Sequence, residues 1–219
     1  HVLIDIPVGP TAKVRQEAMA LRLGAQLVQT GAALGLAVRI QQSDGNQPVG
    51  FGIGPALEAR DVLRVLRRDA GAPADLRTRA LQLAGTLLEM GGATAAGEGL
   101  ARATATLDSG MAWDKFCAIC EAQGGMREPP LSRYQHPMPA RRSGLVAHVN
   151  LRSLAKAAKL AGAPADKAAG IEMHVRLGDE VERGQPLFTM HADTTGELHY
   201  ALDFLEAHQE TVSVEERVL

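Results

Sequence analysis

Several features that would narrow the class of this protein are scarce or missing. Its 219 residues include two cysteines, too few for a disulfide framework, so we expect a reducing, cytoplasmic location. Aromatic residues make up only 3%, and the formal net charge is −2. This balance gives no sign of a polyanionic partner, so we expect binding neither to nucleic acid nor to a membrane. No apolar run approaches the roughly 18 residues of a membrane span, and no segment has the pattern of a signal peptide.

An initiator methionine is missing as well. The chain begins at His1, directly before an apolar run typical of a buried strand. Because a natural domain rarely begins in the middle of its own sheet, we expect this chain to be a piece of a longer protein. Its length is sufficient for one large domain or two small domains, each with a proper core.

The most informative stretch is VLIDIPVGPTAK, residues 2–13. It opens with an apolar run that only Asp5 interrupts, the pattern of a strand buried on both faces of a parallel sheet. A Gly/Pro turn at residues 7–10 ends this strand, and a helical pattern follows over residues 11–35. A strand, a tight turn and a helix start in this order present backbone N–H groups and a helix N-terminus to a ligand.

Lys13 falls in the first turn of the expected helix. It adds a cation where an anion would bind, although a positive charge near a helix N-terminus opposes the helix dipole. Gly9, Thr11 and Lys13 are therefore the candidate substrate-binding residues. The alternative is a solvated surface lysine on an ordinary βα turn, since short Gly/Pro turns of this kind are common.

The remainder of the first half continues the α/β pattern. A strand expected at residues 36–42 completes a βαβ unit with two parallel strands. Residues 43–54 are Gly-rich but lack the G-x-G-x-x-G order of a nucleotide loop, so they form either a ligand-facing loop or a structural turn. Further helices are expected at residues 55–68, 76–90, 93–107 and 109–122. The helix at residues 11–35 should turn one apolar stripe inward, made of Val14, Ala18, Leu21, Ala25, Val28 and Ala32.

Cys117 and Cys120 form a C-x-x-C pair inside the last of these helices. A metal site would need about two further soft ligands, and a thioredoxin-like pair would sit at a helix start after a strand. We therefore expect two packed or idle thiols. The histidines show no H-E-x-x-H or comparable pairing, so no metal site is expected among His148, His174, His191, His199 and His208.

The second half has a different texture. Residues 126–142 hold four prolines and few periodic apolar positions, which is typical of a linker; its Arg141–Arg142 pair suits a solvated face better than a binding patch. Later residues alternate short strand patterns with two helical ones. The expected fold class is thus α/β plus α+β. A partial parallel α/β layer with packed helices occupies residues 1–125, the linker residues 126–142, and a small C-terminal α+β domain residues 143–219.

Several segments resemble one enzyme family, in order and over nearly the whole chain. They are VLIDIPVGPTAKV, QPVGFGIGPALEARDVLRVL, LQLAGTLLEMGG, CEAQGG and VRLGDEVERGQPLFTMHA. These segments are similar to the thymidine and pyrimidine-nucleoside phosphorylases, and more narrowly to a bacterial branch close to archaeal AMP phosphorylases. The motifs GPALEARDVL and GD-x-V-x-x-G-x-P-L are the most specific.

The resemblance implies an enzyme that cleaves a nucleoside with inorganic phosphate as co-substrate, giving a free base and a pentose 1-phosphate. It also implies a homodimer that needs no other cofactor. Only the second half of such an enzyme is covered. The family's K-x-S-x-G-G-x-x-D phosphate loop, and the Asp, Arg, Ser and Lys that contact base and sugar, would lie upstream of Val2. We therefore expect no catalytic residue in this chain, and no activity from it alone.

Two positions match residues with roles in the family. In the AMP-phosphorylase branch the lysine of a G-x-x-A-K turn contacts the 5′-phosphate of the nucleotide, and Lys13 matches it; ordinary thymidine phosphorylases have a G-x-G-A-F turn there. Glu58 matches a glutamate through which some relatives bind a metal, but Pro55 replaces the usual Asn. We carry no metal over and interpret Glu58 as a helix-start carboxylate. The substrate, thymidine-like or AMP-like, stays open, as does a non-catalytic assembly module.

Overall fold

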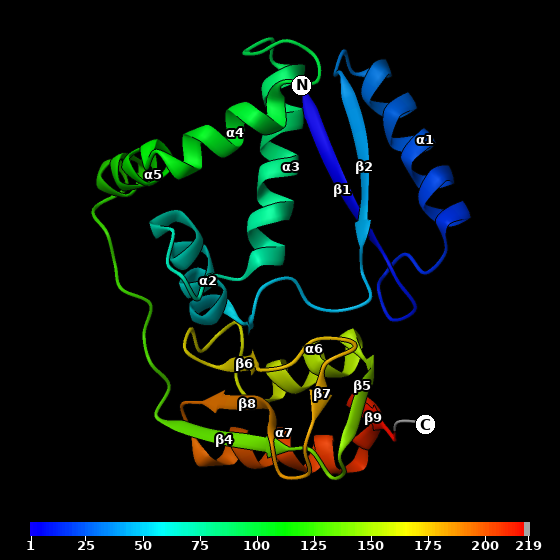
Figure 1. Ribbon diagram of the computed structural model, residues 1–219, viewed down its shortest axis with the longest axis vertical. Coiled ribbons are helices and arrows are strands. Elements are labelled where there is room, and N and C mark those ends of the chain that lie inside the picture. The colour runs from blue at the N-terminus through cyan, green and yellow to red at the C-terminus, as the bar shows by residue number, and fades with distance from the viewer. Residues whose placement is uncertain (217–219) are drawn as a thin grey trace. The chain divides into compact units, whose positions relative to one another are not determined.

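The computed structural model describes residues 1–216, and it divides the chain into two compact units (Figure 1). The first unit consists of His1–Asn46 and Leu63–Arg127; the second consists of Gln47–Val62 and the chain from Glu128 onward. Helices accompany parallel strands in the first unit and antiparallel strands in the second, so the expected α/β plus α+β class is confirmed. Among the helices of residues 1–216, none has both the length and the apolar character needed to cross a membrane.

The first unit begins with the expected βαβ arrangement. Strands β1 (Val2–Val8) and β2 (Val38–Asp44) are parallel neighbours, paired from Val2 opposite Val38 to Val8 opposite Asp44. Helix α1 (Glu17–Ala33) connects them and packs on the face of the pair that carries Ile40 and Val38. The parallel pairing of these two strands was predicted from their apolar patterns and is confirmed.

Helix α1 differs from the expectation in its start and in its buried face. It begins at Glu17 rather than near Thr11. Its buried residues are Ala20, Gly24 and Gly31, whereas the stripe expected to face inward is exposed along the helix, with Leu21 at 60%. The reason is steric: a Cβ on Gly24 would lie 3.2 Å from Ile40, so the helix approaches the sheet closely only through its small residues.

The other helices of the first unit form a small bundle. Its buried cluster consists of Val65, Leu81, Ala103 and Leu107. The helices are α2 (Pro55–Arg67), whose first half belongs to the second unit, α3 (Ala74–Met90), α4 (Gly99–Asp108) and α5 (Met111–Ala122). Helix α4 begins six residues later than expected, because the Glu89 carboxylate accepts hydrogen bonds from the N–H groups of Gly97 and Gly99 at 3.0 and 2.9 Å.

Helices α3 and α4 cross where Gly85 faces Gly99. A Cβ on Gly85 would lie 2.7 Å from the Leu100 nitrogen and 2.8 Å from the Gly99 carbonyl carbon. Neither backbone can move without disturbing its own helix. The crossing therefore depends on glycine.

We expect Gly85→Ala to lower the free energy of unfolding of the first unit by about 1–3 kcal/mol. The loss arises although the same change in an open helix would stabilise it by about 0.8–1 kcal/mol. Gly71→Ala is the matched control, because nothing lies within 4 Å of the added Cβ. Urea titration followed by circular dichroism measures both variants. An equal stability for Gly85→Ala and wild type would show that the two helices can move apart freely.

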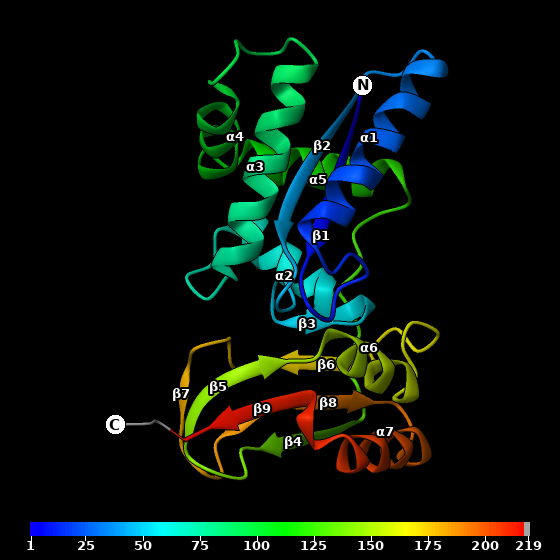
Figure 2. The same ribbon diagram turned by 90° about the vertical axis from the view of Figure 1, so that its right-hand side faces the viewer.

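The described part of the second unit contains two antiparallel sheets with helices packed beside them (Figure 2). One sheet has the order β3-β6-β8-β4 and the other β7-β5-β9. Its core is built around Leu154, Ile171 and Met190. The elements are β3 (Gly52–Ile53), β4 (Tyr134–Pro139), β5 (Gly144–Val149), α6 (Leu151–Leu160), β6 (Gly170–Met173), β7 (Glu180–Val181), β8 (Pro186–Ala192), α7 (Thr195–Ala207), the 3₁₀ turn η1 (Gln209–Thr211) and β9 (Val212–Glu215).

The structure assigns two segments differently from the expected division into residues 1–125, 126–142 and 143–219. The expected linker contains β4, which pairs with β8 at the edge of its sheet. Its prolines are tolerated there because an edge strand leaves one row of backbone groups unpaired. The Gly-rich segment contains β3, which pairs with β6, so residues 47–62 belong to the second unit.

Candidate functional site

The turn after β1 is held together by its own backbone. The N–H of Gly9 donates to the Val14 carbonyl at 3.2 Å, and the N–H of Ala12 donates to the Gly9 carbonyl at 3.1 Å. A Cβ on Gly9 would overlap the carbonyl group of Gly45, which follows β2. Gly9 thus has a structural reason to be glycine: it lets the turns after the two parallel strands touch.

Lys13 lies on this turn, on an exposed bend four residues before α1. The expectation that it occupies the first turn of the helix is wrong, because the backbone of residues 9–14 forms the compact turn. Its ammonium group makes no hydrogen bond or ion pair with any residue between His1 and Glu216. Lys13 is a solvent-exposed cation at this position, and Thr11 beside it is half-buried.

The two turns lie at one edge of the parallel pair, beyond the carboxyl ends of β1 and β2 (Figure 1). This is the edge at which α/β sheets bind ligands. Arg79 of α3 donates to the Asp44 carbonyl at 2.5 Å and lies 3.6 Å from the Asp5 carboxylate. The guanidinium is therefore engaged within the fold, whereas Lys13 is available to an anion. Gly9, Thr11 and Lys13 share this edge, which supplies a binding group but no nucleophile with a base beside it.

The Gly-rich segment of the second unit is held by a residue that sequence reasoning missed. Asp61 of α2 is only 3% exposed, and its Oδ2 accepts hydrogen bonds from the N–H groups of Phe51 and Gly52 at 2.6 and 2.7 Å. Glu58 accepts one from the N–H of Gly54 at 2.9 Å. These donors are occupied by protein carboxylates, which favours the structural turn over a phosphate-binding loop. A signal was present: Asp61 lies one helical turn after Leu57, on the buried face of α2.

The remaining candidates for chemistry are two cysteines of the first unit and two histidines of the second. Cys117 and Cys120 are free, half-buried thiols on α5. His191 is buried with its Nδ1 2.9 Å from the Ser132 hydroxyl, and His174 bonds to Thr189 at 2.7 Å. Within residues 1–216, no group of three or more His, Cys, Asp and Glu side chains is arranged to hold a metal ion.

Removal of the Asp61 carboxylate tests its role. Asp61→Ala leaves two backbone N–H groups without their acceptor, so we expect the second unit to lose about 2–4 kcal/mol of stability. Hydrogen exchange at the Met173 amide, which donates to the Phe51 carbonyl at 2.8 Å, should accelerate accordingly.

Glu58→Ala is the control on the same helix, because this carboxylate is exposed and accepts a single hydrogen bond. This substitution should lower the free energy of unfolding by less than about 1 kcal/mol. Equal exchange rates at Met173 in wild type and Asp61→Ala would contradict the anchoring role.

Comparison with known proteins adds the following. Residues 145–211 match the "Pyrimidine nucleoside phosphorylase C-terminal domain". A protein of Polaromonas named "Putative thymidine phosphorylase" is 60% identical over 214 residues, which cover 98% of this chain and 42% of that protein. A protein of the same name from Hahella chejuensis is 57% identical over 219 residues, or 100% of this chain and 43% of the relative. The chain thus spans less than half the length of these curated relatives.

Proposed function

Because the chain belongs to the thymidine phosphorylase family, as the counterpart of the C-terminal part of its members, we propose that it is the corresponding part of a nucleoside phosphorylase. The observation that carries this proposal is the similarity along the whole chain, at 57% identity over all 219 residues for one relative. The proposed reaction transfers the pentosyl group of thymidine or a related nucleoside from the base to inorganic phosphate. The products are the free base and a pentose 1-phosphate.

Catalysis of this kind depends on holding phosphate against C1′ of a sugar with oxocarbenium character, while fixed donors stabilise the developing charge. No further cofactor is proposed, because phosphate is itself the nucleophile. The edge beyond β1 and β2 offers a cation, but it holds no constellation that could act on the sugar. In this proposal the groups that perform the chemistry lie in residues upstream of Val2, and the enzyme is a cytoplasmic homodimer.

A direct assay tests the division of roles. Removing one preorganised donor typically costs about 10²–10³ in rate, so removing a whole set should abolish turnover. We expect the purified 219-residue chain to release no thymine from thymidine and phosphate above a protein-free control. The intact protein should release it readily. Phosphate-dependent base release by the 219-residue chain would show that this chain carries a catalytic site of its own.

A nucleoside 5′-monophosphate such as AMP is the second candidate substrate. Lys13 favours it, because this lysine is exposed on the ligand-binding edge and matches the G-x-x-A-K turn. A lysine contact to phosphate is a charge-assisted hydrogen bond, worth about 1.5–3 kcal/mol. A plain nucleoside has no 5′-phosphate and gains nothing from it.

Substitution of Lys13 in the intact protein separates the two substrates. If the 5′-phosphate binds at Lys13, Lys13→Ala should lower kcat/KM for AMP by roughly 10- to 100-fold and leave a nucleoside nearly unaffected. Lys115→Ala, an exposed lysine of α5, is the matched control. Equal losses on nucleoside and nucleotide would instead assign Lys13 to the turn or to the inorganic phosphate site, and would restore the thymidine-type substrate as the better candidate.

A further inference from the structure

A small cavity lies in the second unit, between the turn after β4, strands β8 and β9, and the end of α7. Its volume is about 160 Å³. Buried apolar side chains form its floor, among them Phe188, Leu205 and Val212, each at most 7% exposed. Exposed Arg141 and Arg142 and half-buried His208 stand at its rim. Gln209, Thr211 and Ser213 line it as well, so the cavity combines buried apolar side chains with polar ones.

The mouth of this cavity carries positive charge that the fold does not neutralise. No Asp or Glu is among the residues that line it. Arg141 and Arg142 make no hydrogen bond or ion pair with any other residue of the described chain. From the sequence this pair was expected to be a solvated face rather than a binding patch, and both residues are exposed. The cavity beside them is the observation that suggests a binding role. Guanidinium groups bind carboxylates through parallel N–H donors, so an anion at the mouth would be favourable.

The end of α7 could oppose an anion, because helix C-termini carry partial negative charge. Its carbonyl groups are engaged, however. The Leu205 carbonyl accepts from the N–H of His208 at 3.2 Å, and the Phe204 carbonyl accepts from His208 Nδ1 at 2.8 Å. The His208 carbonyl accepts from the Thr211 hydroxyl at 2.7 Å. Because a carbonyl only accepts, Nδ1 carries the proton of this hydrogen bond.

We propose that this cavity binds a small carboxylate whose apolar body is about the size of a six-membered ring. The size follows from the volume, since a cavity of about 150 Å³ with apolar walls holds a benzene molecule. The ring would lie against Phe188, Leu205 and Val212, and the carboxylate would meet Arg141 and Arg142 at the mouth. This site is independent of the phosphorylase function proposed for the intact protein.

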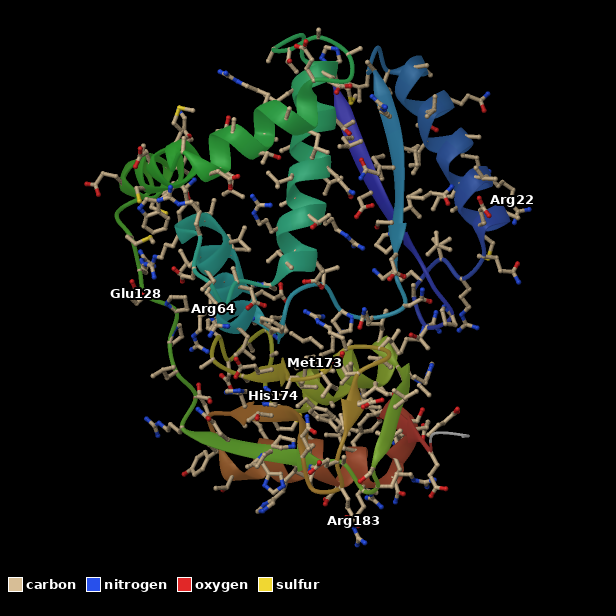
Figure 3. All side chains as sticks on the ribbon, in the orientation of Figure 1. Arg22, Arg64, Glu128, Met173, His174 and Arg183 are labelled. Atoms are coloured by element: carbon tan, nitrogen blue, oxygen red, sulfur yellow. The ribbon has the colours of Figure 1, made fainter. Side chains whose placement is uncertain are left out.

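Isothermal titration of the 219-residue chain with benzoate tests the proposal. A ligand of this size should bind with a dissociation constant on the order of millimolar. Arg141→Ala and Arg142→Ala should each weaken binding by about 10-fold or more, because each removes a charged hydrogen-bond donor. Arg183→Ala is the matched control: Arg183 is exposed and its side chain projects away from the unit (Figure 3). It should leave the affinity unchanged.

Three further ligands separate the contributions of the ring, the charge and the size of the ligand. Benzyl alcohol keeps the ring without the charge, and inorganic phosphate keeps a charge without the ring; both should bind at least about 10-fold more weakly than benzoate. 2-Naphthoate is too large for the cavity and should also bind more weakly, whereas nonspecific adsorption would strengthen with apolar area. Benzoate should shift the amide resonances of Ser213 and Val214, which line the cavity.

The proposal fails if the titration detects no binding at a benzoate concentration about 20-fold above the expected millimolar dissociation constant. It also fails if the two arginine variants retain wild-type affinity, if Arg183→Ala loses as much as they do, or if 2-naphthoate binds more tightly than benzoate. Because both arginines are exposed, their substitution should leave the thermal unfolding midpoint unchanged. Loss of binding can then be separated from loss of fold.

Discussion

Contact between backbones at glycine is the constraint on which both units depend. In the first unit, Gly9 meets the carbonyl of Gly45, and this contact brings together the turns after the two parallel strands. In the second unit, a Cβ on Gly54 would overlap the Ala169 carbonyl, and one on Gly170 would overlap the Ile53 carbonyl. No other residue permits such proximity. The edge that carries Lys13 and the pairing of β3 with β6 both follow from it.

The same constraint explains which parts of the fold could be predicted from the sequence. Strands β1 and β2 were predicted because each combines an apolar run with Gly or Pro near its ends. The buried face of α1 was not, since periodicity gives weight to large side chains such as Leu21. The face that packs on the sheet instead carries Gly24 and Gly31, where the helix backbone can approach β2 closely. Strand β4 was missed because its prolines are compatible only with an edge position, which a local pattern does not reveal.

Carboxylates that accept backbone N–H groups play a second organising role. Asp61, Glu58 and Glu89 each accept hydrogen bonds from backbone N–H groups of a Gly-containing segment. A Gly-rich segment in a sequence suggests a loop whose N–H groups are free to bind phosphate. In this protein those of residues 51, 52 and 54 are taken by the carboxylates of α2, so the segment is stabilised as structure and contributes a strand.

Exposed cations show why the candidate sites could be only partly recognised. In the sequence, Lys13 and the Arg141–Arg142 pair look alike, because each lies within three residues after a proline. Their surroundings differ in space. Lys13 lies beyond the carboxyl ends of two parallel strands, whereas the arginines stand over a cavity with an apolar floor. A cation beside an apolar pocket acts together with the pocket, because the apolar surface of the ligand leaves water in the same binding event. In the two proposals, the arginine site therefore selects for the apolar body of a ligand, and Lys13 selects for a charged group alone.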